Sequence, residues 1–192
     1  METLFKYLVT FAPLSPELRD FLRKTIKTRV VRKKEYLLKA GRSCEYVYFV
    51  SKGIIHCDYE DKDRPVSCWF MKEGDVILLD SFCNQTPSDV NLRALEDATV
   101  HYINYRELRF LENNFLEFNA VSSRVTAKVL GRVWNYFRQT NHQPAELKYQ
   151  FFLDYFPDLG MRIPLKLIAA FLNVSPEWLG KIRTKLNYSR LP

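Results

Sequence analysis

Near the end of the chain, apolar residues recur every three or four positions on both sides of a short turn. The first run lies within residues 162–172, and its apolar positions are Leu165, Ile168, Ala169 and Leu172. This spacing predicts one apolar face on a short helix. Asn173 follows the run, and asparagine tolerates the left-handed backbone conformation that ends many helices. The pattern therefore predicts a helix that ends at residues 172–174.

A second helix is predicted directly after this turn. Ser175 can cap its amino end, Pro176 suits the first helical position, and Glu177 favours the positive end of the helix dipole. Its predicted buried side consists of Trp178, Leu179, Ile182 and Leu186. Two short helices around a tight turn are typical of a helix-turn-helix, whose second helix enters the major groove of DNA.

The outward side of the second predicted helix is polar and contains a glycine. With Leu179 and Ile182 inward, the positions that face outward together are Ser175, Pro176, Glu177, Gly180, Lys181 and Thr184. A glycine in an exposed helix interior costs about 1 kcal/mol relative to alanine, so Gly180 suggests close approach to a partner. Lys181 can reach guanine acceptors or a phosphate, and Glu177 can accept from a cytosine amine. An ordinary antiparallel helix pair with a solvated polar side is the alternative interpretation.

Positive charge is concentrated in the last sixth of the chain. Residues 161–192 contain six cations and one acid, so they carry +5 of the formal net charge of +7. The cations are Arg162, Lys166, Lys181, Arg183, Lys185 and Arg190. Such asymmetry is typical of a phosphate-binding face, although basic tails also occur for solubility alone. The residues predicted to contact DNA are Ser175, Pro176, Glu177, Gly180, Lys181, Arg183, Thr184, Lys185 and Lys166.

The chain before this basic segment begins with helical patterns and continues with short patterns typical of strands. Residues 2–10 and a stretch that opens with Ser15-Pro16-Glu17 have helical character. From about residue 30 to residue 104, seven or so short alternating or apolar runs are separated by turn signals, several of which contain glycine. Strands at such near-even spacing predict a double-sheet roll or sandwich.

A long amphipathic helix is predicted from Phe115 to about Phe137. Its apolar seam is roughly heptad-like and consists of Phe118, Val121, Val125, Val129 and Val133. A narrow seam, with small residues at Ala120 and Ser123, suits pairing with a second copy, so this seam is the predicted homodimer interface. The alternative is that the helix packs only on its own roll. A polar hinge at residues 139–144 then leads into the last domain.

Composition and motif content narrow the classes of function. Hydrophobic residues make up 47% of the 192 positions and aromatic residues 15%, which excludes a disordered chain. No apolar run approaches the length of a membrane span, and the amino end lacks a signal-like segment, so we expect a cytoplasmic protein without a membrane partner. Four cysteines and three histidines are scattered singly, so we predict no metal site, no cofactor and no catalytic residues. A cupin-like enzyme would need clustered metal ligands, so we expect no enzyme.

The order of these elements resembles the cyclic-AMP receptor/FNR family of bacterial transcription regulators over almost the whole chain. In the roll, the residues that carry the resemblance are Ala40-Gly41, Tyr48-Phe49-Val50 with Gly53, and Gly74-Asp75. Residues 87–97 and the later pair Ile168-Ala169 and Ile182-Arg183 are similar to the Bacteroidetes-type branch. The predicted fold class is α+β. It comprises a double-stranded β-roll with N-terminal helices over residues 1–112, a long dimerisation helix and hinge over 113–140, and a helix-turn-helix domain over 141–192.

The resemblance implies a homodimeric, sequence-specific regulator that binds double-stranded DNA at a near-palindromic operator. In the family, the recognition helix starts with Ser, Arg, Glu, two further residues, Gly and Arg. Glu177 and Lys181 carry over as base-contacting residues, whereas Pro176 stands where an arginine is usual. RNA polymerase and an unidentified small-molecule effector are the other partners that the resemblance implies. The alternative is an effector-binding module of the same fold that has lost specific DNA binding.

The phosphate cassette of the family is altered in this chain. In the family, Gly-Asp is followed by a Gly-Glu pair and then by an Arg-Ser or Arg-Thr, whose arginine neutralises the cyclic phosphate. Here Gly74-Asp75 is followed by the bulky pair Leu78-Leu79, and Ser88 and Asp89 stand at the Arg-Ser positions. We therefore predict that cyclic AMP does not bind in the usual way, because the anion would meet a carboxylate. The roll is expected to hold either a different, less anionic effector near Ser81, Ser88, Asn91 and Arg93, or no effector.

Overall fold

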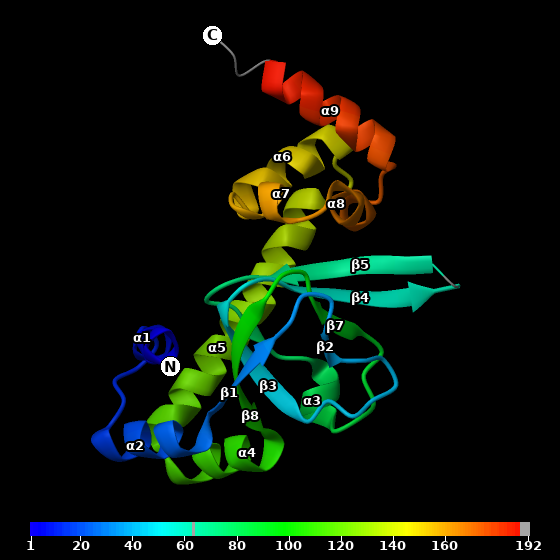
Figure 1. Cartoon of the computed structure of the whole chain (residues 1–192). Helices are drawn as coiled ribbons and strands as arrows, with labels where there is room; N and C mark the ends of the chain where they lie inside the picture. The colour runs from blue at the N-terminus through cyan, green and yellow to red at the C-terminus, as the bar shows by residue number, and fades with distance from the viewer. Residues whose placement is uncertain (63, 189–192) are drawn as a thin grey trace. The chain divides into compact units, whose positions relative to one another are not determined.

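The structure of the protein is a computed structural model that describes residues 1–62 and 64–188. Two features of the predictions fall outside it, namely the charge of Arg190 and the side chain of Leu186. Two compact units make up the chain (Figure 1). The first contains residues 1–59 and 69–131, and the second contains residues 60–68 and the described residues from 132 onward.

The helices and strands described before the long helix form a β-roll and its flanking helices. In chain order they are α1 (Glu2–Val9), α2 (Pro16–Thr25), β1 (Lys27–Val31), β2 (Tyr36–Leu38), β3 (Tyr46–Lys52), β4 (Ile55–Asp61), β5 (Arg64–Met71), β6 (Val76–Ile77), α3 (Asp80–Asn84), β7 (Asn91–Ala94), β8 (Ala98–Asn104) and α4 (Tyr105–Asn114). The remaining helices are α5 (Leu116–Thr140), α6 (Ala145–Tyr155), α7 (Leu159–Arg162), α8 (Leu165–Leu172) and α9 (Pro176–Tyr188).

Two four-stranded sheets form the roll. Their strand orders are β1-β8-β3-β6 and β2-β7-β4-β5. In the first sheet, β8 pairs antiparallel with both β1 and β3, and β3 pairs antiparallel with β6. In the second, β7 pairs antiparallel with β2 and with β4. The predicted double-sheet roll, followed by a long helix and several short C-terminal helices, is therefore confirmed.

One strand was not part of the predicted set. β1 lies at the edge of its sheet, and four of its five residues, Lys27 to Val30, are exposed. A strand with so little burial has no alternation of apolar and polar residues for a pattern search to detect. Its cations, Lys27 and Arg29, suit an edge strand, because charged side chains oppose pairing with another chain.

The main apolar core of the first unit lies on one face of the β1-β8-β3-β6 sheet. Alternation along β3 sends Phe49 to this face and the adjacent Tyr48 to the opposite one. Ile103 of β8, Leu14 between α1 and α2, and residues of helices α1, α2, α4 and α5 are the other members. The buried residues of this core are Leu4, Phe5, Leu8, Leu14, Leu18, Leu22, Phe49, Ile103, Leu111, Phe118, Val121 and Val125.

The long helix α5 corrects the prediction for the dimer interface. Phe118, Val121 and Val125 are buried in this core of their own chain, with 6%, 1% and 9% exposure. The predicted dimer interface required these three residues to be accessible to a second copy, but they are buried in their own chain. Val129 is half-buried and Val133 is exposed. The pattern was misleading because a helix that covers a roll and a helix that pairs with a copy both produce an apolar stripe at three- and four-residue spacing.

The second unit has an aromatic core of its own. Tyr149, Phe152 and Phe156 are buried on and just after α6. Phe171 of α8 contacts this cluster, with its ring centroid 5.8 Å from that of Phe152. The cluster supports α8 and, through it, α9.

Gly53 offers a direct test of the packing in the roll. It has φ +89°, and a Cβ atom added there would lie 2.7 Å from Cβ of Ala98, whereas Gly41, with φ +79°, has open space around the same position. We expect Gly41→Ala to lower the free energy of unfolding by about 1–2 kcal/mol through backbone strain alone. Gly53→Ala should cost about 1–3 kcal/mol more because of the steric clash. Urea unfolding of both variants checks this, and equal losses would contradict the close approach of Gly53 to β8.

Candidate nucleic-acid interface and sensor roll

The predicted helix-turn-helix is present in the second unit as α8 and α9. Ile168, Ala169 and Leu172 of α8 and Leu179 and Ile182 of α9 are all buried. The turn begins at Asn173, which has φ +55° and donates its backbone N–H to the carbonyl oxygens of the preceding turn of helix. Asparagine accepts this left-handed conformation more readily than most residues, so the local sequence determines where α8 ends.

Side-chain hydrogen bonds define the start of α9. The Ser175 hydroxyl accepts the backbone N–H of Trp178 at 3.1 Å, which is the N-cap bond expected from the sequence. Hydrogen bonds from its own backbone N–H and from the Ser175 hydroxyl lower the pKa of Glu177. The carboxylate is thus ionised at neutral pH and is held over the first turn of the helix. Trp178, predicted on the buried side, is only half-buried.

The predicted DNA-contacting residues lie mainly on the side of α9 that faces away from Leu179 and Ile182. Exposed side chains in this set are Ser175, Glu177, Lys181, Thr184 and Lys185, together with Lys166 on α8. Pro176, Gly180 and Arg183 are half-buried. Arg183 lies at the border of this face, because its guanidinium donates to the Met161 sulfur at 3.1 Å. We call the six exposed residues the α9 face.

Packing against the described residues does not require Gly180. Among these residues, a Cβ atom at this position would meet no neighbour closer than Cδ2 of Leu165, at 4.0 Å, which is an ordinary contact. Helix stability alone would favour alanine over glycine by about 1 kcal/mol. The neighbouring Thr184 hydroxyl turns back to donate to the Gly180 carbonyl oxygen at 3.0 Å. No side chain therefore projects from the helix at Gly180, and a partner molecule can approach the helix backbone there.

The long helix carries a second apolar stripe that the sequence interpretation missed. It lies opposite the buried residues of α5 and follows a regular spacing of four, three, four, three, four and three residues. Its members are Leu116, Ala120, Ser123, Ala127, Leu130, Trp134 and Phe137. All except the half-buried Ala120 are exposed. The same strict spacing is visible in the sequence, but the larger side chains at Phe118, Val121 and Val125 drew attention to the opposite side.

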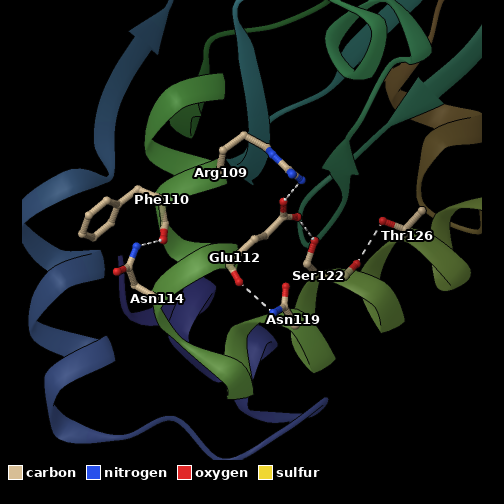
Figure 2. A network of polar contacts seen from close by, with 7 residues as sticks. All are labelled: Arg109, Phe110, Glu112, Asn114, Asn119, Ser122 and Thr126. Atoms are coloured by element: carbon tan, nitrogen blue, oxygen red, sulfur yellow. Dashed lines mark hydrogen bonds and ion pairs between the residues drawn. The ribbon is translucent and has the colours of Figure 1, made fainter.

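Polar contacts hold the corner between α4 and α5 (Figure 2). The Glu112 carboxylate accepts from the Arg109 guanidinium at 2.6 Å and from the Ser122 hydroxyl at 2.8 Å. The Glu112 carbonyl oxygen accepts from the Asn119 side-chain amide at 2.7 Å. Glu112 therefore links the last turn of α4 to the first turns of α5, where Val121 and Val125 enter the core.

Part of the altered cassette segment lies beside the core of the first unit. Val76 and Leu78 line an apolar cavity of about 100 Å³, and Val121 and Val125 line the same cavity from α5. Nearby, Ser81 is buried in α3. The Ser88 hydroxyl accepts the Val90 N–H at 3.2 Å and donates to the Val90 carbonyl oxygen at 3.0 Å. It thereby closes a local turn.

Asn91 and Arg93, the other predicted effector residues, take part in a polar cluster on the β2-β7-β4-β5 sheet. The Asn91 amide donates to the Asp58 carboxylate at 2.9 Å, and the guanidinium of Arg93 lies 3.8 Å from the same carboxylate and over the ring of Tyr36. His56 lies 3.2 Å from Asp58 and is buried. The structure brings Asn91 and Arg93 together around one acid, and Asp58 reduces the positive charge that Arg93 offers to an anion.

The described residues contain neither a metal-binding cluster nor a membrane-spanning helix. Histidine, cysteine, aspartate and glutamate side chains do not gather there into a group of three or more that could hold a metal ion. In the same part of the chain, every helix is too short or too polar to cross a membrane.

Comparisons with known proteins identify the roll. Residues 28–114 match the family described as the cyclic nucleotide-binding domain. FixK2 from Bradyrhizobium japonicum is 18% identical, with a TM-score of 0.74 over 86% of each chain. TTHB099, a CRP-family transcriptional regulator from Thermus thermophilus, is 15% identical, with a TM-score of 0.69 over 84% of this chain and 85% of its own.

A third structure, a CooA mutant from Carboxydothermus hydrogenoformans, is 17% identical, with a TM-score of 0.69 over 91% of this chain and 82% of that one. No curated protein sequence matches the chain. The predicted resemblance to the cyclic-AMP receptor/FNR family is thus confirmed for the roll and for the fold of the chain. The assignment to the Bacteroidetes-type branch stays a prediction.

The buried His56 generates a prediction about pH. Burial lowers its pKa to about 4, although the nearby Asp58 acts in the opposite direction. Below about pH 6.5 the unfolded chain binds a proton at this residue that the folded chain does not, so the free energy of unfolding falls as the pH falls towards 4. The loss is up to about 1.4 kcal/mol per pH unit.

We expect His56→Gln to remove this contribution, so that urea unfolding between pH 7 and pH 5 shows a smaller slope. His101, whose pKa is also lowered by burial, accounts for part of the slope that remains. The control is His142→Asn, because His142 is exposed and asparagine tolerates its φ of +60°. Equal slopes for the wild type and His56→Gln would contradict the prediction.

Proposed function

Because residues 28–114 belong to the cyclic nucleotide-binding domain family, we propose that the chain is a sensor roll joined to a DNA-binding domain, and that it acts as a homodimeric transcription regulator. The observation that carries the proposal is the α9 face. Its lysines lie beside Gly180, on one side of a capped helix whose other side is buried. This is the arrangement that a recognition helix needs to enter the major groove.

Lys181 and Glu177 are the proposed base-contacting residues. Lysine donates to the acceptors of guanine, and an ionised glutamate accepts from a cytosine amine. Lys166 and Lys185, at the borders of the face, are proposed to contact phosphates. Pro176 has no N–H or charged group to offer, so the operator is expected to differ at the position that an arginine contacts in the family.

Dimerisation is proposed to use the exposed stripe of α5 rather than the predicted valine seam. Residues at strict four- and three-residue spacing form the contact line of a left-handed coiled coil. Small side chains at Ala120, Ser123 and Ala127 allow close approach, and Leu130 and Trp134 supply apolar area. A two-fold dimer of this kind would present its recognition helices to a near-palindromic operator.

The second candidate is a module of the same fold that binds an effector and has lost specific DNA binding. The observation that favours it is Pro176, which replaces the usual arginine at the start of the recognition helix. RNA polymerase and a small-molecule effector remain proposed partners, and a non-enzymatic role in the cytoplasm follows from the same proposal. Selection of bound fragments from the organism's own genomic DNA, followed by retention assays, separates the two candidates.

The first prediction from this function concerns salt and Lys181. Affinity for a selected operator should fall by about 0.9 log unit per log unit of salt for each phosphate that the protein neutralises. Lys181→Glu should abolish specific binding, because it places a negative charge against the bases. Fluorescence anisotropy with labelled operator and a scrambled duplex gives both quantities.

The charge-matched control is Lys24→Glu, which changes the net charge equally on an exposed residue of α2 in the first unit. This control should retain most of the operator affinity. If the two variants lost affinity equally, only the total charge of the protein would matter, and the α9 face would not be the interface.

A further prediction concerns the stripe of α5. Leu130→Asp should place a charge in the coiled-coil contact and produce monomers in sedimentation equilibrium, whereas Gln139→Asp, on the other side of the same helix, should leave the dimer intact. Both positions are exposed, so the monomeric variant should remain folded. A wild-type monomer at micromolar concentration would refute dimerisation, and a dimer of Leu130→Asp would refute this interface.

A further inference from the structure

The β-roll contains a cavity that neither the DNA-binding proposal nor the predicted effector residues use. It has a volume of about 400 Å³, within the range of pockets that hold small ligands. Strands of both sheets and the loop between β2 and β3 line it. The lining residues that bear on its chemistry are Arg29, Tyr36, Arg42, Tyr46, Tyr48 and Tyr102.

Aromatic rings form one wall of this cavity. Tyr48 and Tyr102 are direct cross-strand partners on β3 and β8, and Tyr46 lies two residues before Tyr48, on the same face of the sheet. The ring centroids of Tyr46 and Tyr102 are 5.0 Å apart with an edge-to-face geometry. Tyr36 contributes a fourth ring from β2. Such a wall offers flat surfaces on which another aromatic ring can pack.

Cations outnumber acids in the lining. Arg29, Lys39 and Arg42 face one acid, Glu45, so the lining side chains have a net charge of +2. Arg29 is partly neutralised by an ion pair of 2.5 Å with Glu35. Within the described residues, Arg42 has no carboxylate partner, and Lys39 lies over the ring of Tyr36 at 5.0 Å. An anionic group of a ligand could therefore pair with Arg42, although Glu45, which hydrogen-bonds with Tyr46, lies in the same lining.

The hydroxyl of Tyr48 is a polar group in this cavity without a partner in the described part of the chain. Its side chain is 5% exposed, and burial is the main cause that raises its pKa, so the hydroxyl stays protonated. The hydroxyl oxygen itself keeps some exposure, so a molecule in the cavity can reach it. A protonated phenol can donate to an anion or to another acceptor on a bound molecule.

We propose that this cavity binds a small aromatic molecule that carries one anionic group. The ring packs against the tyrosine wall, Arg42 pairs with the anion, and the Tyr48 hydroxyl donates to it. The lining includes no residue of the segment from Gly74 to Arg93, in which the family resemblance places the cyclic phosphate. The lining thus excludes the segment that the family uses for the cyclic phosphate, and the proposed binding does not depend on DNA binding.

The test is calorimetry of the full chain with phenyl phosphate, benzoate, phenol and inorganic phosphate. Phenyl phosphate or benzoate should bind saturably and at least about tenfold more tightly than phenol, because phenol lacks the anion. Phenyl phosphate or benzoate should also bind more tightly than inorganic phosphate, because inorganic phosphate lacks the ring. The comparison of phenyl phosphate with benzoate identifies the preferred anionic group.

Variants then locate the binding site. Arg42→Gln should weaken the preferred probe about tenfold or more, and Tyr48→Phe, which removes only the hydroxyl, about three- to tenfold. The matched controls are Arg32→Gln and Tyr59→Phe, which change the same residue types on exposed positions outside the cavity. Both controls should bind as the wild type does.

Three outcomes would overturn the proposal. They are the absence of saturable binding by both aromatic anions, equal affinity for inorganic phosphate, and equal losses in the controls and the cavity variants. Arg42 lies on an exposed loop, so Arg42→Gln keeps the test valid even if Tyr48→Phe unfolds. Loss of operator binding by the wild type would leave these expected results unchanged, so a failure of the proposed function is distinguishable from a failure of this site.

Discussion

The packing of one side of α5 onto the β1-β8-β3-β6 sheet is the contact on which the rest of the first unit depends. Phe118, Val121 and Val125 are buried in one core with Phe49 of the sheet, and residues of α1 and α2 belong to the same core. Because this side is committed to its own roll, the opposite stripe of α5 is left for the proposed contact with a second copy. The same helix therefore serves as an outer wall of the roll and as the proposed surface for assembly, without a conflict between the two roles.

Local signals predicted the helix-turn-helix well, and they failed for the long helix. The ends of α8 and α9 are set by Asn173 and Ser175, whose effects are confined to neighbouring backbone groups. The stripes of α5 are different, because burial there depends on strands that are distant in the sequence. Val121 and Leu130 both fit an apolar repeat, and only the tertiary structure separates a core position from a surface position.

In the roll, too, the sequence alone did not reveal features that are built from distant segments of the chain. The absence of an arginine at Ser88 and the bulk at Leu78 were visible in the sequence, and the structure places Leu78 against the core. The tyrosine-lined cavity was not predicted, because its walls come from several strands and one loop that have no common motif. β1, which supplies Arg29, lacks even the alternation that reveals a strand. Pattern analysis detects a departure from a family motif more readily than a cavity whose walls come from distant segments.

The corner between α4 and α5 has a mechanical consequence. Glu112 is hydrogen-bonded to Arg109 on its own helix and to Ser122 and Asn119 on the next. These side-chain contacts therefore fix the corner at which the two helices meet. Strand β8 runs directly into α4. Strand β8 carries Tyr102 in the wall of the cavity. Continuous secondary structure and the hydrogen bonds of Glu112 thus join the tyrosine wall to the start of the long helix.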